Sequence, residues 1–334
     1  IMFGDSMRNF IKKSMSVLLA AVLMCMFWLP MRAEDVDVSD EVEALRYYFY
    51  HRGADLDTLL GYGNYGNMVL RSIRFYGDFW ESIGVKKNDY SQLYIPPDES
   101  TAQKAQALLA QLALDLPVEL VDAFTQQQDG SFAGCETVAD NLICFIALEA
   151  AQKKVTDRAV YSSRLAKEWT LSVQGEDGSF GGDAVTTALA LSYLSMFAEE
   201  EAISRGAMYI RGQIDTLQTV TQVADVICGL SDAGVAVNSG DYQNLPGILA
   251  SYRQADGSYG QVEESLHALA AFDSLASQQS PYKKLMTNGS YSDNLLQKLT
   301  PLLLIYGVLA LLSVVFWLYI FLGKPKIRRT EETE

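Results

Sequence analysis

A short turn motif recurs three times along this chain. Asp-Gly-Ser followed by an aromatic residue occupies residues 129–132, 177–180 and 256–259, each time after a glutamine-containing helix end and before an Ala/Leu-rich stretch. Asp-Gly favours a tight turn because Gly readily takes positive φ, and the aromatic ring can then pack back on a helix pair. We expect the following turn residues to be structural: Asp129, Gly130, Phe132, Asp177, Gly178, Phe180, Asp256, Gly257 and Tyr259.

The helices that follow these turns define a repeat. Aligning them at Val138, Thr187, Val223 and Val262 gives spacings of 49, 36 and 39 residues, in the range of helix-pair repeats. The copy at Val223 has lost its turn motif. A lone helix pair cannot bury its apolar face, so the repeats must stack or close into a ring. Because no segment is rich in strand signals, the sequence predicts an all-α domain.

The N-terminal segment has the layout of a secretory signal peptide. Arg8, Lys12 and Lys13 form a basic region, and the 15 residues Met15–Leu29 carry no charge. Ala33 is the predicted cleavage position, which assigns residues 1–33 to the signal. An uncleaved signal anchor is the alternative.

The C-terminal region predicts a membrane span. Residues 302–322 are 21 residues without a charge and would extend roughly 31 Å as a helix. Lys and Arg follow at once, so the positive-inside rule places the tail in the cytoplasm and the rest of the chain on the extracellular side of the cytoplasmic membrane. The predicted segments are a less clearly repeating helical part (34–100), the repeats (101–280), a polar linker (281–299), a transmembrane helix (300–322) and a tail (323–334).

Charge and composition exclude several functions. The net charge of −15 argues against a nucleic-acid partner, which needs a basic face. Two histidines in the chain exclude a His-rich metal site, and no metal site is predicted. The predicted extracellular part contains Cys135, Cys144 and Cys228, an odd number that gives no disulfide framework. Cys144 and Cys228 are expected to be buried free thiols because apolar helical stretches surround them.

The repeat resembles that of the terpenoid cyclase and protein prenyltransferase superfamily. The similarity covers about Thr101 to Leu285 and includes Gly181–Leu191 and Thr221–Leu230, which are similar to bacterial surface members. These members in turn resemble cobalamin carriers of the intrinsic factor and transcobalamin type. The resemblance implies an α/α toroid of inner and outer helices. It is specific for the fold and uninformative about function, because enzymes and binding proteins share this fold.

The catalytic motifs of the superfamily are missing from the sequence. No Asp-x-Asp-Asp motif of the squalene-cyclase type occurs in the repeats. His267 does not fall at the position of the prenyltransferase zinc histidine, which aligns near Glu264. Gly134-Cys135-Glu136 lacks the glutamine of a thioester motif. The sequence therefore favours a non-catalytic role.

Acids recur in the first turns of three repeat helices, at Asp140, Asp225 and Glu264. In a toroid such acids could contact a ligand at the cavity mouth. The alternative is structural, because the exposed N–H groups and dipole of a helix start favour a carboxylate there.

Aromatic residues near the start of the domain are the other ligand-binding candidates. Tyr47, Tyr50, Tyr62 and Tyr65 could line a pocket mouth. Packing of their rings against the core is the simpler interpretation.

Three functions follow from these features. The first is capture of a corrinoid or another bulky small molecule, which would need a separate β-domain clamp protein and a membrane transporter as partners. The second is a terpenoid cyclase-like or prenyltransferase-like enzyme acting on an isoprenoid at the membrane, marked by a cavity carboxylate with a raised pKa. The third is a protein-interaction module, which a centre filled by side chains would favour.

Overall fold

The computed structural model describes residues 37–51, 63–72, 83, 99–114, 116, 120–152 and 161–287. Within these ranges the chain forms α-helices, short 3-10 helices and turns, and β-pairing is limited to isolated bridges in the turn motifs. The all-α prediction is therefore confirmed. No helix among these residues has both the length and the apolar character needed to cross a bilayer. The predicted signal, membrane helix and tail lie outside the described residues.

The described residues form eleven α-helices and three 3-10 helices. The α-helices are α2 (Ser39–His51), α4 (Gly63–Ser72), α6 (Thr101–Ala113), α7 (Val138–Gln152), α8 (Ser163–Ser172), α9 (Ala184–Leu194), α10 (Glu200–Gln213), α11 (Val220–Asp232), α12 (Leu245–Ala250), α13 (Val262–Ser277) and α14 (Pro281–Met286). The 3-10 helices are η1 (Leu120–Ala123), η2 (Ile214–Thr216) and η3 (Gly240–Tyr242).

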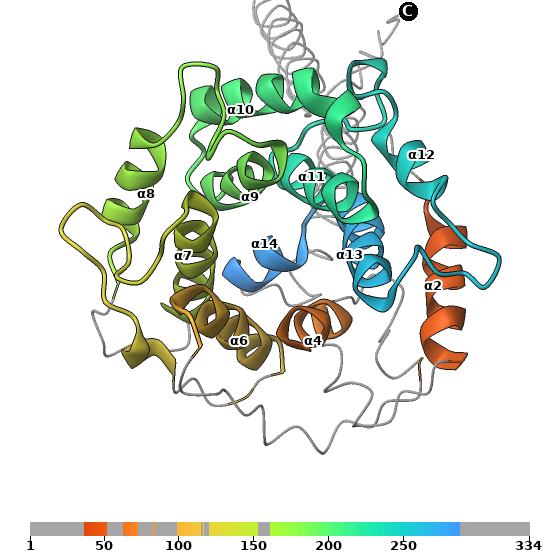
Figure 1. The fold of residues 1–334 in the computed structure, drawn as a ribbon, viewed down its shortest axis with the longest axis horizontal. Coiled ribbons are helices and arrows are strands. Elements are labelled where there is room, and N and C mark those ends of the chain that lie inside the picture. The colour runs from red at the N-terminus through yellow and green to blue at the C-terminus, as the bar shows by residue number, and fades with distance from the viewer. Residues whose placement is uncertain are drawn as a thin grey trace, which may run out of the picture.

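Two layers of helices surround a common centre (Figure 1). The inner helices are α4, α6, α7, α9, α11 and α13, and α2, α8, α10 and α12 lie outside them. Contacts between inner helices run from α4 through α6, α7, α9, α11 and α13 back to α4. The inner helices α7, α9, α11 and α13 bury most of their residues, as expected for helices covered on several sides.

The turn motifs are built by one repeated set of hydrogen bonds. In the second copy, Asp177 Oδ1 accepts from the backbone N–H (3.0 Å) and the hydroxyl (2.7 Å) of Ser179. These bonds hold the pKa of Asp177 below its usual range. Gln174 Nε2 donates to the carbonyl of Gly178 (3.1 Å) and closes the turn from the other side. The same aspartate-to-serine bonds join Asp129 to Ser131 and Asp256 to Ser258.

Each turn motif also packs against an outer helix. Gly178 has φ +92°, and a Cβ on it would lie 2.5 Å from the carbonyl oxygen of Arg205 in α10. Gly257 has φ +85°, and its Cβ would lie 2.6 Å from the carbonyl oxygen of Ala44 in α2. Only glycine combines this backbone conformation with such a close approach. The last turn motif thus joins the end of the repeats to the first described helix.

The structure corrects the alignment of the repeats. In each copy, the N–H of the aromatic turn residue donates to a buried side chain of the following helix: Phe132 to Asn141 (2.8 Å), Phe180 to Thr187 (2.9 Å) and Tyr259 to Ser265 (3.0 Å). Asn141 and Thr187 are therefore equivalent and 46 residues apart. The 49-residue spacing from the sequence alignment was wrong, because the polar partner of the turn, rather than the first valine, fixes the register.

The helix α14 lies at the centre of the inner helices (Figure 1). It contacts α4, α6, α7 and α9. Pro281, Lys284 and Met286 are buried there. The linker predicted for residues 281–299 is therefore wrong for 281–286, which belong to the helical body, and residues 288–299 lie outside the described part of the chain.

Candidate functional site

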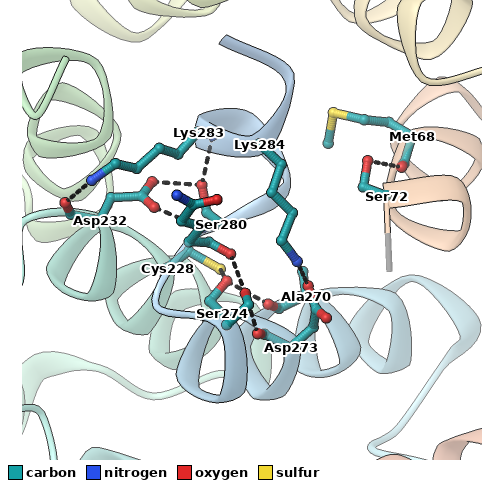
Figure 2. A network of polar contacts seen from close by, with 12 residues as sticks. Met68, Ser72, Cys228, Asp232, Ala270, Asp273, Ser274, Ser280, Lys283 and Lys284 are labelled. Atoms are coloured by element: carbon teal, nitrogen blue, oxygen red, sulfur yellow. Dashed lines mark hydrogen bonds and ion pairs between the residues drawn. The ribbon is translucent and has the colours of Figure 1, made fainter. Parts of the chain in front are cut away.

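Local signals turn the chain back into the ring directly after α13. Gln278 ends α13 in the left-handed conformation, with φ +57°. Ser280 then caps α14, since its hydroxyl accepts a hydrogen bond from the N–H of Lys283 (3.2 Å). Pro281 takes the first helical position, where a missing N–H has no cost. From α14, the side chain of Lys283 extends toward Asp232 and that of Lys284 toward Asp273 (Figure 2).

Asp232, at the end of α11, holds the start of α14. Its Oδ1 accepts from the backbone N–H of Ser280 (2.6 Å), and its Oδ2 accepts from the Ser280 hydroxyl (2.5 Å). Lys283 Nζ donates to the backbone carbonyl of Asp232. Asp232 is buried, and burial raises the pKa of its carboxyl although Lys283 and Ser280 favour the charged form. The carboxylate thus has hydrogen-bonding partners on both oxygens.

Asp273 of α13 forms a buried ion pair with Lys284 (Figure 2). The side chain of Asp273 is 0% exposed and that of Lys284 is 9% exposed. Oδ2 of Asp273 accepts from Lys284 Nζ, whereas Oδ1 has no hydrogen-bond partner among the described residues. Burial raises the pKa of Asp273, and Lys284 opposes this rise. A pair so shielded from water depends on both partners, because either charge alone would be strongly disfavoured there.

A second polar cluster joins three inner helices. His267 Nδ1 of α13 lies 2.6 Å from Asp225 Oδ1 of α11, and the two side chains are 12% and 25% exposed. The ring of Tyr65 in α4 stacks on the imidazole, with ring centroids 4.1 Å apart and an interplanar angle of 18°. Burial raises the pKa of Tyr65 and of Tyr282 in α14, and the nearby carboxylate of Asp225 raises both further. Tyr282 therefore brings α14 next to this cluster.

The chemistry open to this cluster is hydrogen bonding and proton transfer. A carboxylate at Nδ1 orients the imidazole and leaves Nε2 to meet a ligand or exchange a proton. Cys228, on α11, is not an activated nucleophile, because burial raises the pKa of its thiol well above the ordinary value, although the Ser274 hydroxyl that donates to its Sγ (3.4 Å) opposes this rise. Within the described ranges, no group of three or more His, Cys, Asp or Glu residues is arranged to hold a metal ion.

The three candidate acids do not form one set. Asp140 Oδ2 accepts from the N–H of Thr137 (3.0 Å), and Glu264 Oε2 accepts from the N–H of Gln261 (2.7 Å). Both acids therefore cap the N-termini of their own helices, which is the structural role considered as the alternative to ligand binding. Asp225 lies one turn further into its helix and pairs with His267 instead. Only Asp225 is part of a cluster between helices.

The candidate aromatic residues are also divided. Tyr47 and Tyr50 are 60% and 57% exposed on α2, which is an outer helix, and both rings contact His51. They lie away from the centre. Tyr65 is the one described candidate that reaches the inner cluster, through its stack with His267. Tyr62 lies outside the described residues.

The residues that hold α14 were missed from the sequence. Asp232 and Asp273 are acids near the ends of otherwise apolar helices, and Lys283 and Lys284 follow a proline in a polar segment. An acid among buried residues needs a polar or charged partner, so its position in an apolar helix was the signal that a buried contact exists. The partner could not be identified because Asp232 and Ser280 are 48 residues apart in the sequence.

Comparisons of the chain with protein-family models, with curated proteins and with solved structures found no match. The resemblance of the turn motifs to the toroid superfamily therefore stays a prediction. The functional interpretation depends on the geometry of α14 and of the Asp225–His267 pair.

Proposed function

We propose that this chain is a membrane-anchored, extracytoplasmic α/α toroid that acts as a protein-interaction module. The observation that carries the proposal is the position of α14 at the centre of the inner helices. A ligand-binding toroid would take its ligand into that space, since small-molecule sites are concave and largely preformed. Here a segment of the chain itself takes the place. The charge-free run at residues 302–322 and the signal-like N-terminus support the membrane anchor.

The contacts of α14 are those of an integral, buried part of the fold. Met286 is 0% exposed within the core, and Lys284 pairs with the fully buried Asp273. If α14 left the ring, the carboxylate of Asp273 would lose Lys284, and that of Asp232 would lose its hydrogen bonds from Ser280. The free energy needed to leave such groups unpaired opposes a small molecule that enters by displacing α14.

The pKa values of Asp232 and Asp273 are raised, as expected for a carboxyl that acts as a general acid in an enzyme. Asp273, however, pairs with Lys284, and Asp232 accepts hydrogen bonds from Ser280 beside Lys283, so burial within a structural network accounts for the raised pKa of both carboxyls. Structural ion pairs perturb pKa values as effectively as catalytic sites do. These carboxyls therefore give no support to the isoprenoid enzyme over the interaction module.

The outer helices offer a surface for a partner. Met208 of α10 and Tyr47 and Tyr50 of α2 are the large apolar side chains that stand most exposed in the described part of the chain. Exposed aromatic and methionine side chains are enriched at protein interfaces. The interaction module would use this outer side, and α14 would keep the ring rigid from within.

Capture of a bulky small molecule is the second candidate, favoured by the Asp225–His267–Tyr65 cluster. This cluster has a partly exposed imidazole beside an aromatic ring, an arrangement suited to a polar, planar ligand. A corrinoid is the ligand that the sequence resemblance implies. Because Tyr282 of α14 lies near Asp225, this candidate requires α14 to move when the ligand binds.

The test combines two measurements on the full chain in detergent or native membranes. A photo-crosslinking residue at Met208 should give a discrete adduct with one membrane or surface protein, and the same residue at Glu168, which is exposed on α8, is the matched control. Calorimetric titration with cobalamin, cobinamide and a polyprenyl diphosphate should give no saturable signal. Saturable binding of a corrinoid would overturn the interaction module in favour of ligand capture, and polyprenyl binding alone would favour the enzyme.

A further inference from the structure

Two cysteines lie side by side after the first turn motif. Cys135 follows the turn, Cys144 is in the second turn of α7, and their Sγ atoms are 3.6 Å apart. Cys144 is fully buried, whereas Cys135 is partly exposed. The third described cysteine, Cys228, has Ser274 as its hydrogen-bond partner instead. The sequence predicted a buried free thiol at Cys144 but not this contact with Cys135. The contact depends on how the loop after the turn motif folds back on α7, which the sequence pattern does not specify.

The two thiols differ in their environment. The hydrogen bond between the two thiols lowers the pKa of Cys135, and partial burial opposes that shift. The same bond and burial raise the pKa of Cys144, whose Sγ also lies 3.7 Å from the carbonyl oxygen of Thr101. Cys135 is therefore the thiol that is both reachable from solvent and easier to deprotonate. An exposed attacking thiol beside a buried resolving thiol is the arrangement that disulfide exchange requires.

We propose that Cys135 and Cys144 form a redox-active pair that is oxidised to a disulfide by exchange with an external disulfide, either a small molecule such as oxidised glutathione or the disulfide of an oxidoreductase. The thiolate of Cys135 attacks one sulfur of the external disulfide and releases one thiolate. Cys144 then loses its proton and attacks the mixed disulfide at Cys135, which releases the second thiol. The two cysteines are oxidised by two electrons, and the external disulfide is reduced to two thiols.

The geometry needs little adjustment for this reaction. A disulfide has an S–S distance of about 2.05 Å, so the two sulfurs need to approach by only about 1.5 Å. Cys135 lies in a loop, which can move more easily than α7. The new bond would tie the loop after the turn motif to the inner helix α7. Closing a short loop in this way should raise the midpoint of thermal unfolding by roughly 4 °C in a chain of this size.

The experiment uses the full chain in detergent, incubated with excess oxidised glutathione, quenched with acid, alkylated and digested with trypsin. Lys104 and Lys153 bracket one tryptic peptide that contains both cysteines. The wild-type peptide should lose about 2 Da and resist alkylation until a reductant is added, as an internal disulfide requires. Persistence of two alkylatable thiols in that peptide, or of a glutathione adduct on Cys135, would overturn the proposal.

Matched variants separate the roles of the two cysteines. Cys228→Ala should show the same loss of about 2 Da as the wild type, because Cys228 lies outside the pair. Cys144→Ser should stop at a glutathione adduct on Cys135, whereas Cys135→Ser should leave Cys144 largely unmodified. Failure of Cys144→Ser to trap an adduct on Cys135 would contradict the assigned order of attack. The wild-type measurement stands by itself if either variant fails to fold. None of these outcomes depends on the proposed interaction function.

Discussion

Replacing Lys284 by methionine tests whether α14 is held inside the ring by a buried ion pair. Methionine is close to lysine in length and removes only the charge. Asp273 would keep its position, 0% exposed, with Oδ1 already lacking a partner and Oδ2 losing its donor. Leaving one charge of a buried pair uncompensated costs about 3–5 kcal/mol of folding free energy. This is a large fraction of the total stability of about 5–15 kcal/mol that folded domains have.

The effect of Lys284→Met should depend on pH. Burial raises the pKa of Asp273 above its ordinary 3.8 even beside Lys284. Protonation of Asp273 therefore stabilises the fold; this contribution is complete below pH 3.8 and is lost as pH rises through the raised folded-state pKa. Without the ammonium group the folded-state pKa rises further. The variant should consequently lose more stability than the wild type as pH rises from 3.8 through the raised folded-state pKa.

Urea unfolding of the full chain in detergent, followed by circular dichroism, measures these differences. The matched control is the double variant Lys284→Met with Asp273→Leu, which removes both charges and should be more stable than Lys284→Met alone. An exposed ion pair would give a different result. Lys284→Met would then cost less than about 1 kcal/mol of folding free energy, and this cost would not change with pH. That result would refute the assignment of α14 to the centre.

Two further substitutions test the turn motifs. Gly178→Ala should cost about 2–5 kcal/mol of folding free energy, because it adds strain at positive φ and a clash with α10. Gly182→Ala is also at positive φ but has open space around it, so it should cost only about 1–2 kcal/mol. Equal costs in urea unfolding would exclude a role of Gly178 in packing the turn against α10. Asn141→Leu leaves the buried N–H of Phe132 without an acceptor and should cost about 1–3 kcal/mol. Asn141→Thr, which copies Thr187 in the next repeat, should recover part of this loss, and an equal loss in both variants would argue against the shared turn geometry.

Local chemistry made part of the fold predictable. The glutamine, the Asp-Gly-Ser turn and the aromatic residue contact one another within a few positions, so the motif can be recognised directly in the sequence. The exact register of the repeats was not predictable in this way. It depends on Asn141, Thr187 and Ser265, three different residue types that perform the same task. An alignment by residue type therefore overlooks their equivalence.

The interior site was less predictable because its partners are distant in sequence. Asp225 was identified as an acid of interest, but its partner His267 lies 42 positions away and on another helix. The segment containing Lys283 and Lys284 looked like a linker because its composition is polar. Polar composition normally indicates solvent exposure, and here buried aspartates on α11 and α13 reverse that inference.

Hydrogen exchange across α14 is the most direct test of the account. The N–H of Lys284 bonds to the carbonyl of Ser280 (3.0 Å), and that of Thr287 bonds to the carbonyl of Lys283 (2.9 Å). If α14 is part of the packed body, these amides should exchange as slowly as those of α13, because both open together. The measurement uses the full chain in detergent with mass-spectrometric or NMR detection. Exchange of the α14 amides at the rate of an unstructured peptide, while α13 stays protected, would contradict the central position of α14.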